Sequence, residues 1–100
     1  MINLPRPLFS SLKTLATPMA LDAMAAAHAQ IDDLLGRHFS GDWGDVDPDD
    51  AIANDDAITN GSRILSAYIL STGVRIWVLT EAAVNNGARI ATTVLLPSEY

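Results

Sequence analysis

The hydrophobic pattern of this chain changes period once, near Asn60-Gly61. Before this point apolar residues recur every three to four positions, which is typical of amphipathic helices. From Arg63 onward they alternate with a period of two, in stretches rich in β-branched and aromatic residues that are typical of strands. A chain of 100 residues is long enough for one core but not for two independent ones. We therefore expect a single α+β domain over residues 1–100, with three N-terminal helices packed on a three- to four-stranded antiparallel sheet.

Helices are predicted over residues 18–28, 31–38 and 48–59, although the first two could run together. Thr17-Pro18 and Asp47-Pro48 each combine a residue that caps free amides with a proline suited to the first helical position. In the third helix Asn54 lies among apolar residues, so its amide requires a partner and could satisfy the backbone of the preceding loop. Helical spacing predicts buried stripes that contain Leu21, Met24 and His28 in the first helix, and Ile31, Leu34, Leu35 and His38 in the second.

Strands are predicted over residues 12–16, 63–70, 74–80 and 89–96, with a compact hairpin loop at Ser71-Thr72-Gly73. Residues 1–11 contain two prolines, which exclude a helix and favour an extended N-terminal arm. One face of the sheet should lie under the helices. It contains either Ile64, Tyr68, Ile76, Val78, Ile90 and Val94 or the alternate set of residues.

A strongly acidic stretch begins at the segment Gly41-Asp42-Trp43-Gly44-Asp45. Residues 40–62 carry seven aspartates and no lysine or arginine. The two glycines permit a tight turn, in which Trp43 is either a buried lid on the core, the favoured interpretation, or an exposed binding anchor. Acidic side chains on the outside of this segment would form a surface for a partner. The candidate partner-binding residues are Asp42, Trp43, Asp45, Asp49, Asp50, Asp55 and Asp56.

The net charge of −6, with six basic residues scattered along the chain, disfavours direct binding to nucleic acid, because phosphate contacts need a clustered basic face. The absence of cysteine excludes disulfides, thiolate metal sites and a cysteine nucleophile. No apolar run reaches the roughly 18 residues that a membrane span needs. We therefore expect a cytoplasmic protein with a protein partner and without a membrane or nucleic-acid partner.

Two histidines limit the catalytic and metal-binding alternatives. His38 with Asp42 and Arg63 could form a small enzyme site, but a packing or capping histidine is the favoured interpretation. A metal ion could use His28 with Asp32, or His38 with Asp42, but neither pair has further ligands at a defined spacing. The sequence therefore predicts no cofactor, no metal ion and no enzymatic activity.

Three arginines, Arg63, Arg75 and Arg89, lie on or next to predicted strands and could align in one row. Internal salt bridges are the favoured interpretation of this row, and an anion or partner site is the alternative. The candidate carboxylate partners are Asp55, Glu81 and Glu99.

Several motifs follow one another along the chain: Ala16-Thr17-Pro18-Met19-Ala20-Leu21, Arg37-His38, Gly41-Asp42-Trp43-Gly44-Asp45, Asn54-Asp55, Arg63-Ile64-Leu65-Ser66-Ala67-Tyr68, Ile76-Trp77-Val78-Leu79-Thr80-Glu81-Ala82 and Thr92-Thr93-Val94-Leu95-Leu96-Pro97-Ser98-Glu99-Tyr100. In this order they resemble a family of small bacterial proteins carried on plasmids and integrative elements. Some members of this family are labelled type I restriction endonuclease subunit M. The resemblance covers residues 8–100, with two departures. Met19 stands where the family usually has glycine. The family's last hairpin has a tight Glu-Ala-Asp-Arg-Ser turn, whereas residues 83–88 lengthen that loop here and only Arg89 matches the arginine of the turn.

The resemblance implies that the protein is cargo of mobile DNA and takes part in surviving or controlling host defence. Together with the acidic stretch, it leads us to expect a non-enzymatic protein-binding module that acts as an anti-CRISPR or anti-restriction inhibitor. Carboxylates on its surface would replace phosphates in the basic groove of a defence complex. The alternatives are an accessory structural or regulatory protein that dimerises, through residues 12–16 or another sheet edge, and a small enzyme.

Overall fold

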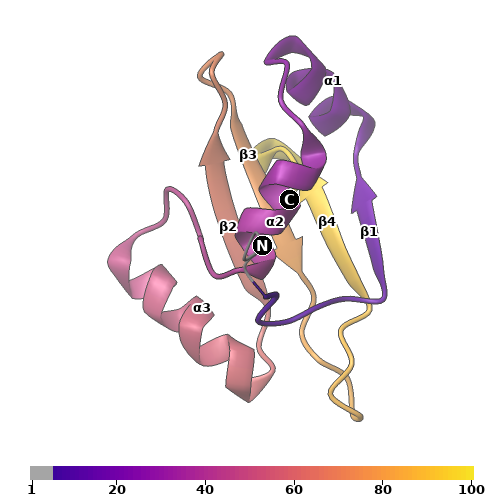
Figure 1. Cartoon of the computed structure of the whole chain (residues 1–100), viewed down its shortest axis with the longest axis vertical. Helices are drawn as coiled ribbons and strands as arrows, with labels where there is room; N and C mark the ends of the chain where they lie inside the picture. The colour runs from indigo at the N-terminus through magenta and orange to yellow at the C-terminus, as the bar shows by residue number, and fades with distance from the viewer. Residues whose placement is uncertain (1–5) are drawn as a thin grey trace, which may run out of the picture.

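The computed structural model describes residues 6–100 and shows three helices and a four-stranded sheet, which confirms the α+β class (Figure 1). The strands lie in the order β1-β4-β3-β2. Helices α1 and α2 cover one face of this sheet, and α3 lies beside β2 (Figure 1). The elements are β1 (Lys13–Ala16), α1 (Pro18–Ala26), α2 (Ile31–Phe39), α3 (Pro48–Asn60), β2 (Ile64–Ile69), β3 (Arg75–Thr80), β4 (Ala91–Leu95) and the 3₁₀ helix η1 (Pro97–Glu99).

The sheet is mixed, and the expectation of an antiparallel sheet is wrong in this respect. β3 pairs antiparallel with both β2 and β4, but β1 pairs parallel with β4, from Lys13 opposite Ala91 to Ala16 opposite Val94. The expectation of three N-terminal helices also needs correction, because β1 precedes α1 and lies beside the last strand. The side-chain pattern of a four-residue strand carries no information about its direction, since both pairings alternate in the same way.

Helix α1 begins as predicted, because the Thr17 side chain accepts a hydrogen bond from the Ala20 N–H at 3.1 Å. It ends at Ala26, earlier than expected, and His28 then adopts a left-handed backbone with φ of 53° that separates α1 from α2. The predicted buried stripe is therefore wrong at His28 and Leu21, which are both exposed.

The face of the sheet beneath α1 and α2 buries the predicted residues of β2, β3 and β4, with one exception. Ile90 is exposed, because β4 begins only at Ala91 and the alternation does not extend back to it. Three hydroxyl residues complete this face and are fully buried. The buried set comprises Ile64, Ser66, Tyr68, Ile76, Val78, Thr80, Thr92 and Val94.

The predicted N-terminal arm packs against the end of α2 over the part that the structure describes. Residues 1–5 of the arm lie outside the described residues. The Leu8 N–H donates to the Phe39 carbonyl at 2.7 Å, and the Phe9 ring contacts the rings of His38 and Phe39 edge-on, with centroid distances of 5.2 Å. The arm thus closes the open end of the aromatic cluster around His38.

Candidate functional site

The loop between α2 and α3 attaches to the outer edge of β2 as a short extra strand. Gly44 forms a parallel bridge with Ala67, whose N–H donates to the Trp43 carbonyl at 3.0 Å and whose carbonyl accepts from the Asp45 N–H at 2.7 Å. Gly44 has φ of 73°, and a Cβ atom at this position would overlap the Ala67 carbonyl oxygen. The close approach of the loop to the strand therefore requires glycine.

Asn54 closes the neighbouring position of the same edge. Its side chain is 5% exposed, its Nδ2 donates to the Leu65 carbonyl at 2.8 Å, and its Oδ1 accepts from the Leu65 N–H at 3.2 Å. The prediction that this inward amide finds backbone partners is confirmed, but the partner is β2 and not the loop. Leu65 and Ala67 are thus both paired on the side of β2 that faces away from β3, so α3 and the loop are fixed to the sheet.

Trp43 is a buried lid, as favoured from the sequence. Its side chain is 6% exposed and packs with Ala57 and Ile64, and its Nε1 donates to Asp55 at 3.0 Å. The alternative of an exposed binding anchor does not fit this burial. Trp43 is therefore not a partner-binding residue, although the sequence had suggested it as a candidate; it holds the loop against α3.

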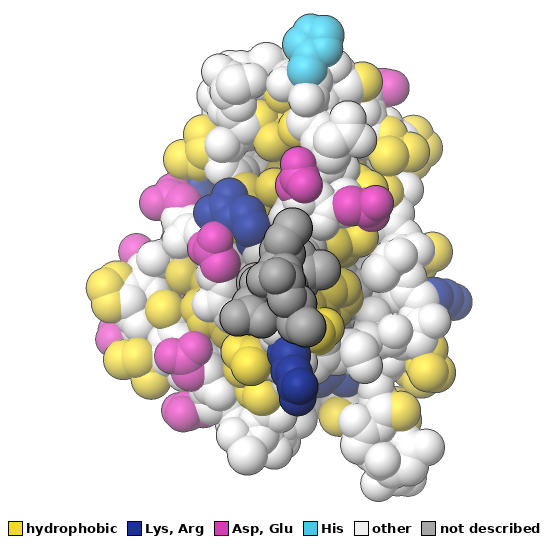
Figure 2. Space-filling view, in the orientation of Figure 1, with side chains coloured by type: hydrophobic (Ala, Val, Ile, Leu, Met, Phe, Trp, Pro, Cys, Tyr) yellow, Lys and Arg dark blue, Asp and Glu magenta, His cyan; other side chains and the backbone are white. Residues whose placement is uncertain are grey.

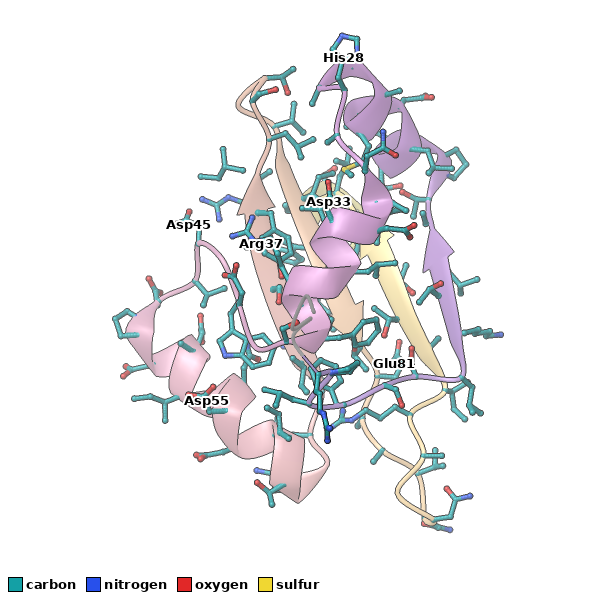
Figure 3. All side chains as sticks on the ribbon, in the orientation of Figure 1. His28, Asp33, Arg37, Asp45, Asp55 and Glu81 are labelled. Atoms are coloured by element: carbon teal, nitrogen blue, oxygen red, sulfur yellow. The ribbon has the colours of Figure 1, made fainter. Side chains whose placement is uncertain are left out.

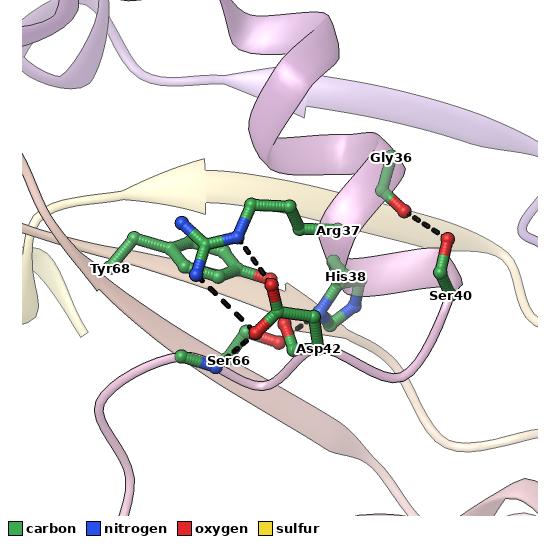
Figure 4. A network of polar contacts seen from close by, with 8 residues as sticks. Gly36, Arg37, His38, Ser40, Asp42, Ser66 and Tyr68 are labelled. Atoms are coloured by element: carbon green, nitrogen blue, oxygen red, sulfur yellow. Dashed lines mark hydrogen bonds and ion pairs between the residues drawn. The ribbon is translucent and has the colours of Figure 1, made fainter. Parts of the chain in front are cut away.

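Two of the predicted carboxylates have their own arginine. Arg37 binds Asp42 through two nitrogens, at 2.6 and 3.3 Å, and this hydrogen bonding holds the pKa of Asp42 below its usual value (Figure 4). The Arg37 guanidinium lies 4.5 Å from the centre of the Tyr68 ring, whose hydroxyl donates to the Asp42 carbonyl at 2.7 Å. Arg75 pairs with Asp45 at 2.6 Å. Both carboxylates thus belong to the internal structure of the loop.

The remaining aspartates of this segment form no ion pair within residues 6–100, although Arg63 and Arg75 line the same shallow pockets as Asp50. Within residues 6–100, ion pairs form only at Arg37–Asp42 and Arg75–Asp45, and α3 itself contains no basic residue. Figure 3 shows Asp55 on α3 and Asp45 on the loop that precedes the helix. The exposed carboxylates of this segment that form no ion pair are Asp47, Asp49, Asp50, Asp55 and Asp56. We call this set the acidic helix surface.

An exposed isoleucine in the middle of this surface was missed from the sequence. Ile52 is 59% exposed and lies one helical turn from both Asp49 and Asp56. In Figure 2 acidic and apolar side chains alternate over the region of α3. The sequence does indicate this exposure, because residue 52 is not three or four positions from Asn54 or Ala57 and so lies on a different face of the helix from these buried residues. An apolar residue at such a position faces solvent.

His38 belongs to a buried chain of hydroxyl groups. Its Nδ1 lies 2.6 Å from Ser66 Oγ and its Nε2 lies 2.7 Å from Thr80 Oγ1. Burial, assisted by the charge of Arg89, lowers the pKa of His38 to about 3, so its ring is neutral at pH 7. The chain continues from Thr80 to Thr92 at 2.7 Å and from Thr92 to Ser11 at 2.8 Å.

One orientation satisfies every member of this chain. The Ser11 hydroxyl donates to the Lys13 carbonyl at 3.0 Å, so it is free to accept from Thr92, which in turn accepts from Thr80. Thr80 then accepts from the Nε2–H of His38, while Nδ1 accepts from Ser66. We assign this tautomer from the network. It links α2 to all four strands, and it gives His38 the packing role that the sequence favoured.

The structure does not bring His38, Asp42 and Arg63 together as an enzyme site would require. His38 is fully buried, Asp42 pairs with Arg37, and Arg63 lies over the ring of Tyr100 with 5.5 Å from guanidinium to ring centre. His28 points away from the protein at the end of α1 (Figure 3). Within residues 6–100, no three His, Asp or Glu side chains are grouped so as to hold a metal ion.

Of the three strand arginines, Arg75 forms an internal salt bridge as favoured, but with Asp45, and the candidate partners Asp55, Glu81 and Glu99 are wrong. Arg89 is buried and donates to the carbonyls of Ala57, Ser62 and Glu81, at 2.7, 2.8 and 3.0 Å. The Ala57 carbonyl lies in the last turn of α3, where it also accepts from the Gly61 N–H at 2.9 Å, and carbonyls at this end of a helix carry partial negative charge that suits a buried cation. Arg89 therefore ties the end of α3 to the sheet, and burial lowers its pKa.

The chain matches no family model, and no curated protein or solved structure is significantly similar to it. In the part that the structure describes, no helix has the length and apolar character needed to cross a membrane. The function is therefore inferred from the residues of the chain itself.

Proposed function

We propose that the protein is a non-enzymatic protein-binding module whose acidic helix surface docks into a basic groove that otherwise binds nucleic acid. One observation carries this proposal. The arginines of the described chain form ion pairs with Asp42 and Asp45, and the five aspartates of the acidic helix surface form none. Carboxylates that form no ion pair, gathered on and just before one helix, attract a positively charged surface and accelerate its association.

The spacing of these carboxylates supports the comparison with phosphates. From Asp47 to Asp56 the chain advances nine residues, or about 13.5 Å along a helix axis at about 1.5 Å per residue. The average is one charge per about 3.4 Å, which is about the axial spacing of phosphates along one strand of B-DNA, with gaps that range from about 1.5 Å between adjacent aspartates to about 7.5 Å between Asp50 and Asp55. A groove lined with lysine and arginine would therefore meet a similar charge density on this helix.

Ile52 would contribute affinity as well as charge complementarity. Interfaces commonly contain an apolar contact at the centre and polar groups at the rim. Ile52 is exposed between Asp49 and Asp56, so it would lose water from its side chain when the surrounding carboxylates meet their cations. The partner groove should accordingly have an apolar patch on its floor.

The resemblance to proteins of plasmids and integrative elements suggests the class of partner. Mobile DNA faces CRISPR and restriction complexes, whose basic grooves bind nucleic acid. We propose such a complex as the target, with inhibition by occupation of the groove. The location of the protein would then be the cytoplasm, where these complexes act.

The test uses the full chain with Asp49, Asp50 and Asp56 replaced by asparagine. None of these side chains makes a hydrogen bond within residues 6–100, so the fold should persist while binding to a defence nuclease weakens by at least about tenfold at low salt. Protection of plasmid DNA from that nuclease should fall in parallel.

The matched control replaces Asp22, Asp32 and Asp33, which are exposed on α1 and α2, by asparagine. Both triple variants change the net charge by the same amount, and both remove two acids from the first turn of a helix. If the two variants protect DNA equally well, or if both are as active as the parent protein, the acidic helix surface is merely a solvated face and the proposal is wrong.

A further inference from the structure

The outer side of edge strand β2 is paired with other parts of the chain, whereas the outer side of edge strand β1 is not, within residues 6–100. At the β2 edge the loop pairs with Ala67 and Asn54 pairs with Leu65. At the β1 edge no other element of residues 6–100 pairs with the outer side of the strand, which lies on the opposite side of the molecule from α3 (Figure 1). Sheet edges with unpaired backbone groups are templates for another strand.

The hydrogen bonds of β1 show which of its groups face outward. The Lys13 N–H donates to Ile90 and the Thr17 N–H donates to Val94. Because backbone groups alternate in direction along a strand, Thr14 and Ala16 point their N–H and carbonyl groups away from β4. These outward groups are flanked by the side chain of Leu15, which is 48% exposed.

We propose that β1 is the dimerisation edge of this protein, where a second copy pairs its own β1 antiparallel about a two-fold axis at Leu15. In this register Thr14 of each copy exchanges hydrogen bonds with Ala16 of the other, which uses all four outward N–H groups of the two strands. This inference does not depend on the proposed function of α3.

The side chains of β1 fit this register. Leu15 faces Leu15 of the second copy in a non-hydrogen-bonded pair, the closer of the two antiparallel arrangements, so both exposed side chains lose contact with water. Lys13 lies on the same side of the strand and faces Thr17 of the second copy. Since Thr17 donates a hydrogen bond to Glu99 at 2.7 Å, the Lys13 ammonium comes near an opposite charge. A lone edge lysine that usually discourages pairing is thus accommodated here.

The dimer would contain one eight-stranded sheet with β2 at each outer edge. Because α3 lies beside β2, the two acidic helix surfaces would occupy opposite ends of the assembly (Figure 1). A two-fold partner, or two grooves on one complex, could then be bound by both ends at once. The surface that dimerises and the surface that binds the target remain separate.

A cysteine at the two-fold axis tests the register, because the chain contains no cysteine of its own. In a Leu15→Cys variant the two Cα atoms would be about 4.5 Å apart, as in a non-hydrogen-bonded antiparallel pair. A disulfide can bridge this separation. We expect a covalent dimer under mild oxidation. Ile69→Cys is the matched control, because Ile69 is similarly exposed, at 56%, but lies at the β2 edge. Equal cross-linking of the two variants would contradict the proposal.

Sedimentation velocity of the unmodified chain over a range of concentrations gives an independent measurement. We expect a dimer, and we expect Thr14→Pro to weaken it at least about 30-fold, since two hydrogen bonds are lost per dimer. Proline is tolerated on an edge strand where its missing N–H faced solvent, so the circular dichroism spectrum should be retained. Ile69→Pro, at an outward position of the other edge, should leave the dimer intact. A parent protein that remains monomeric up to millimolar concentration would overturn the proposal.

Discussion

The carboxamide of Asn54 hydrogen-bonds to both backbone groups of Leu65, so one side chain of α3 acts as a short piece of strand at the sheet edge. This relationship fixes α3 beside β2 and determines where the acidic helix surface stands. Changes at this joint should therefore affect both the stability of the fold and the placement of the carboxylates.

Replacing Asn54 by alanine should lower the free energy of unfolding by about 2 kcal/mol, because two hydrogen bonds are lost and the Leu65 backbone groups are left without partners. Denaturant unfolding, followed by circular dichroism, measures this loss. Asn85→Ala is the control, since Asn85 is exposed and its side chain makes no hydrogen bond within residues 6–100, and it should change stability by less than about 0.5 kcal/mol. Equal losses in the two variants would show that the Asn54 contacts are unimportant.

Replacing Gly44 by alanine should lower the free energy of unfolding more than replacing Gly73 by alanine. Both glycines have a left-handed backbone, with φ of 73° and 89°, but an added Cβ overlaps Ala67 and Tyr68 at Gly44 and meets nothing within 4 Å at Gly73. Gly73→Ala should cost about 1 kcal/mol of unfolding free energy from backbone strain alone. Gly44→Ala should cost at least about 3 kcal/mol, since overpacking adds to that strain. A difference near zero in thermal or denaturant unfolding would contradict the loop pairing with β2.

Stability should decline in mild acid because of His38. Its pKa of about 3 in the folded protein lies below its ordinary value near 6.5, so between these values the unfolded chain binds a proton that the folded protein excludes. The free energy of unfolding should therefore fall by up to about 1.4 kcal/mol per pH unit below pH 6.5. Asp42, whose pKa is lowered by Arg37, adds a loss in the same direction only at lower pH.

Urea unfolding at several pH values between 5 and 7 isolates the contribution of His38, since carboxylates hardly titrate there. His38→Gln should be less stable at pH 7 but should show a flatter dependence on pH. The surface variant His28→Gln serves as the control and should keep the slope of the parent protein. A parent slope near zero would mean that the pKa of His38 is the same in the folded and unfolded states, contrary to this prediction.

The hydroxyl group of Thr80 should contribute more to the free energy of unfolding than the packing of its side chain does. Thr80→Val preserves the volume but leaves His38 Nε2 and Thr92 without the hydroxyl that joins them, at a cost of about 2 kcal/mol in unfolding free energy. Thr93→Val, one position from Thr92 on the other side of the strand, is the control and should be nearly neutral. Chemical denaturation of both variants distinguishes a connected network from simple packing of the threonine side chain.

Features encoded by neighbouring residues could be predicted from the sequence. The Thr17-Pro18 start of α1, the hairpin around Ser71-Thr72-Gly73 and the burial of Trp43 all follow from local conformational preference or from hydrophobic spacing. The acidic run was likewise visible, although the structure was needed to show which aspartates Arg37 and Arg75 already neutralise.

Features that depend on distant partners could not be predicted. The hydrogen-bonded chain from Ser66 to Ser11 joins residues that alternation alone would assign to a sheet face without saying which hydroxyls meet. The attachment of Gly44 to Ala67 depends on a steric fit between two segments, for which a single glycine is a weak signal. Arg89 bonds to backbone carbonyls, which are present at every residue and so give no pattern to read.

The parallel pairing of β1 with β4 has a consequence for synthesis. Lys13 is synthesised well before its partner Ala91, so β1 has no strand to join until α1, α2, α3, β2 and β3 have all been made. The entropy of closing so long a loop is lost late, and pairings of this kind fold slowly. During translation β1 thus stays unpaired until the residues of β4 have been made.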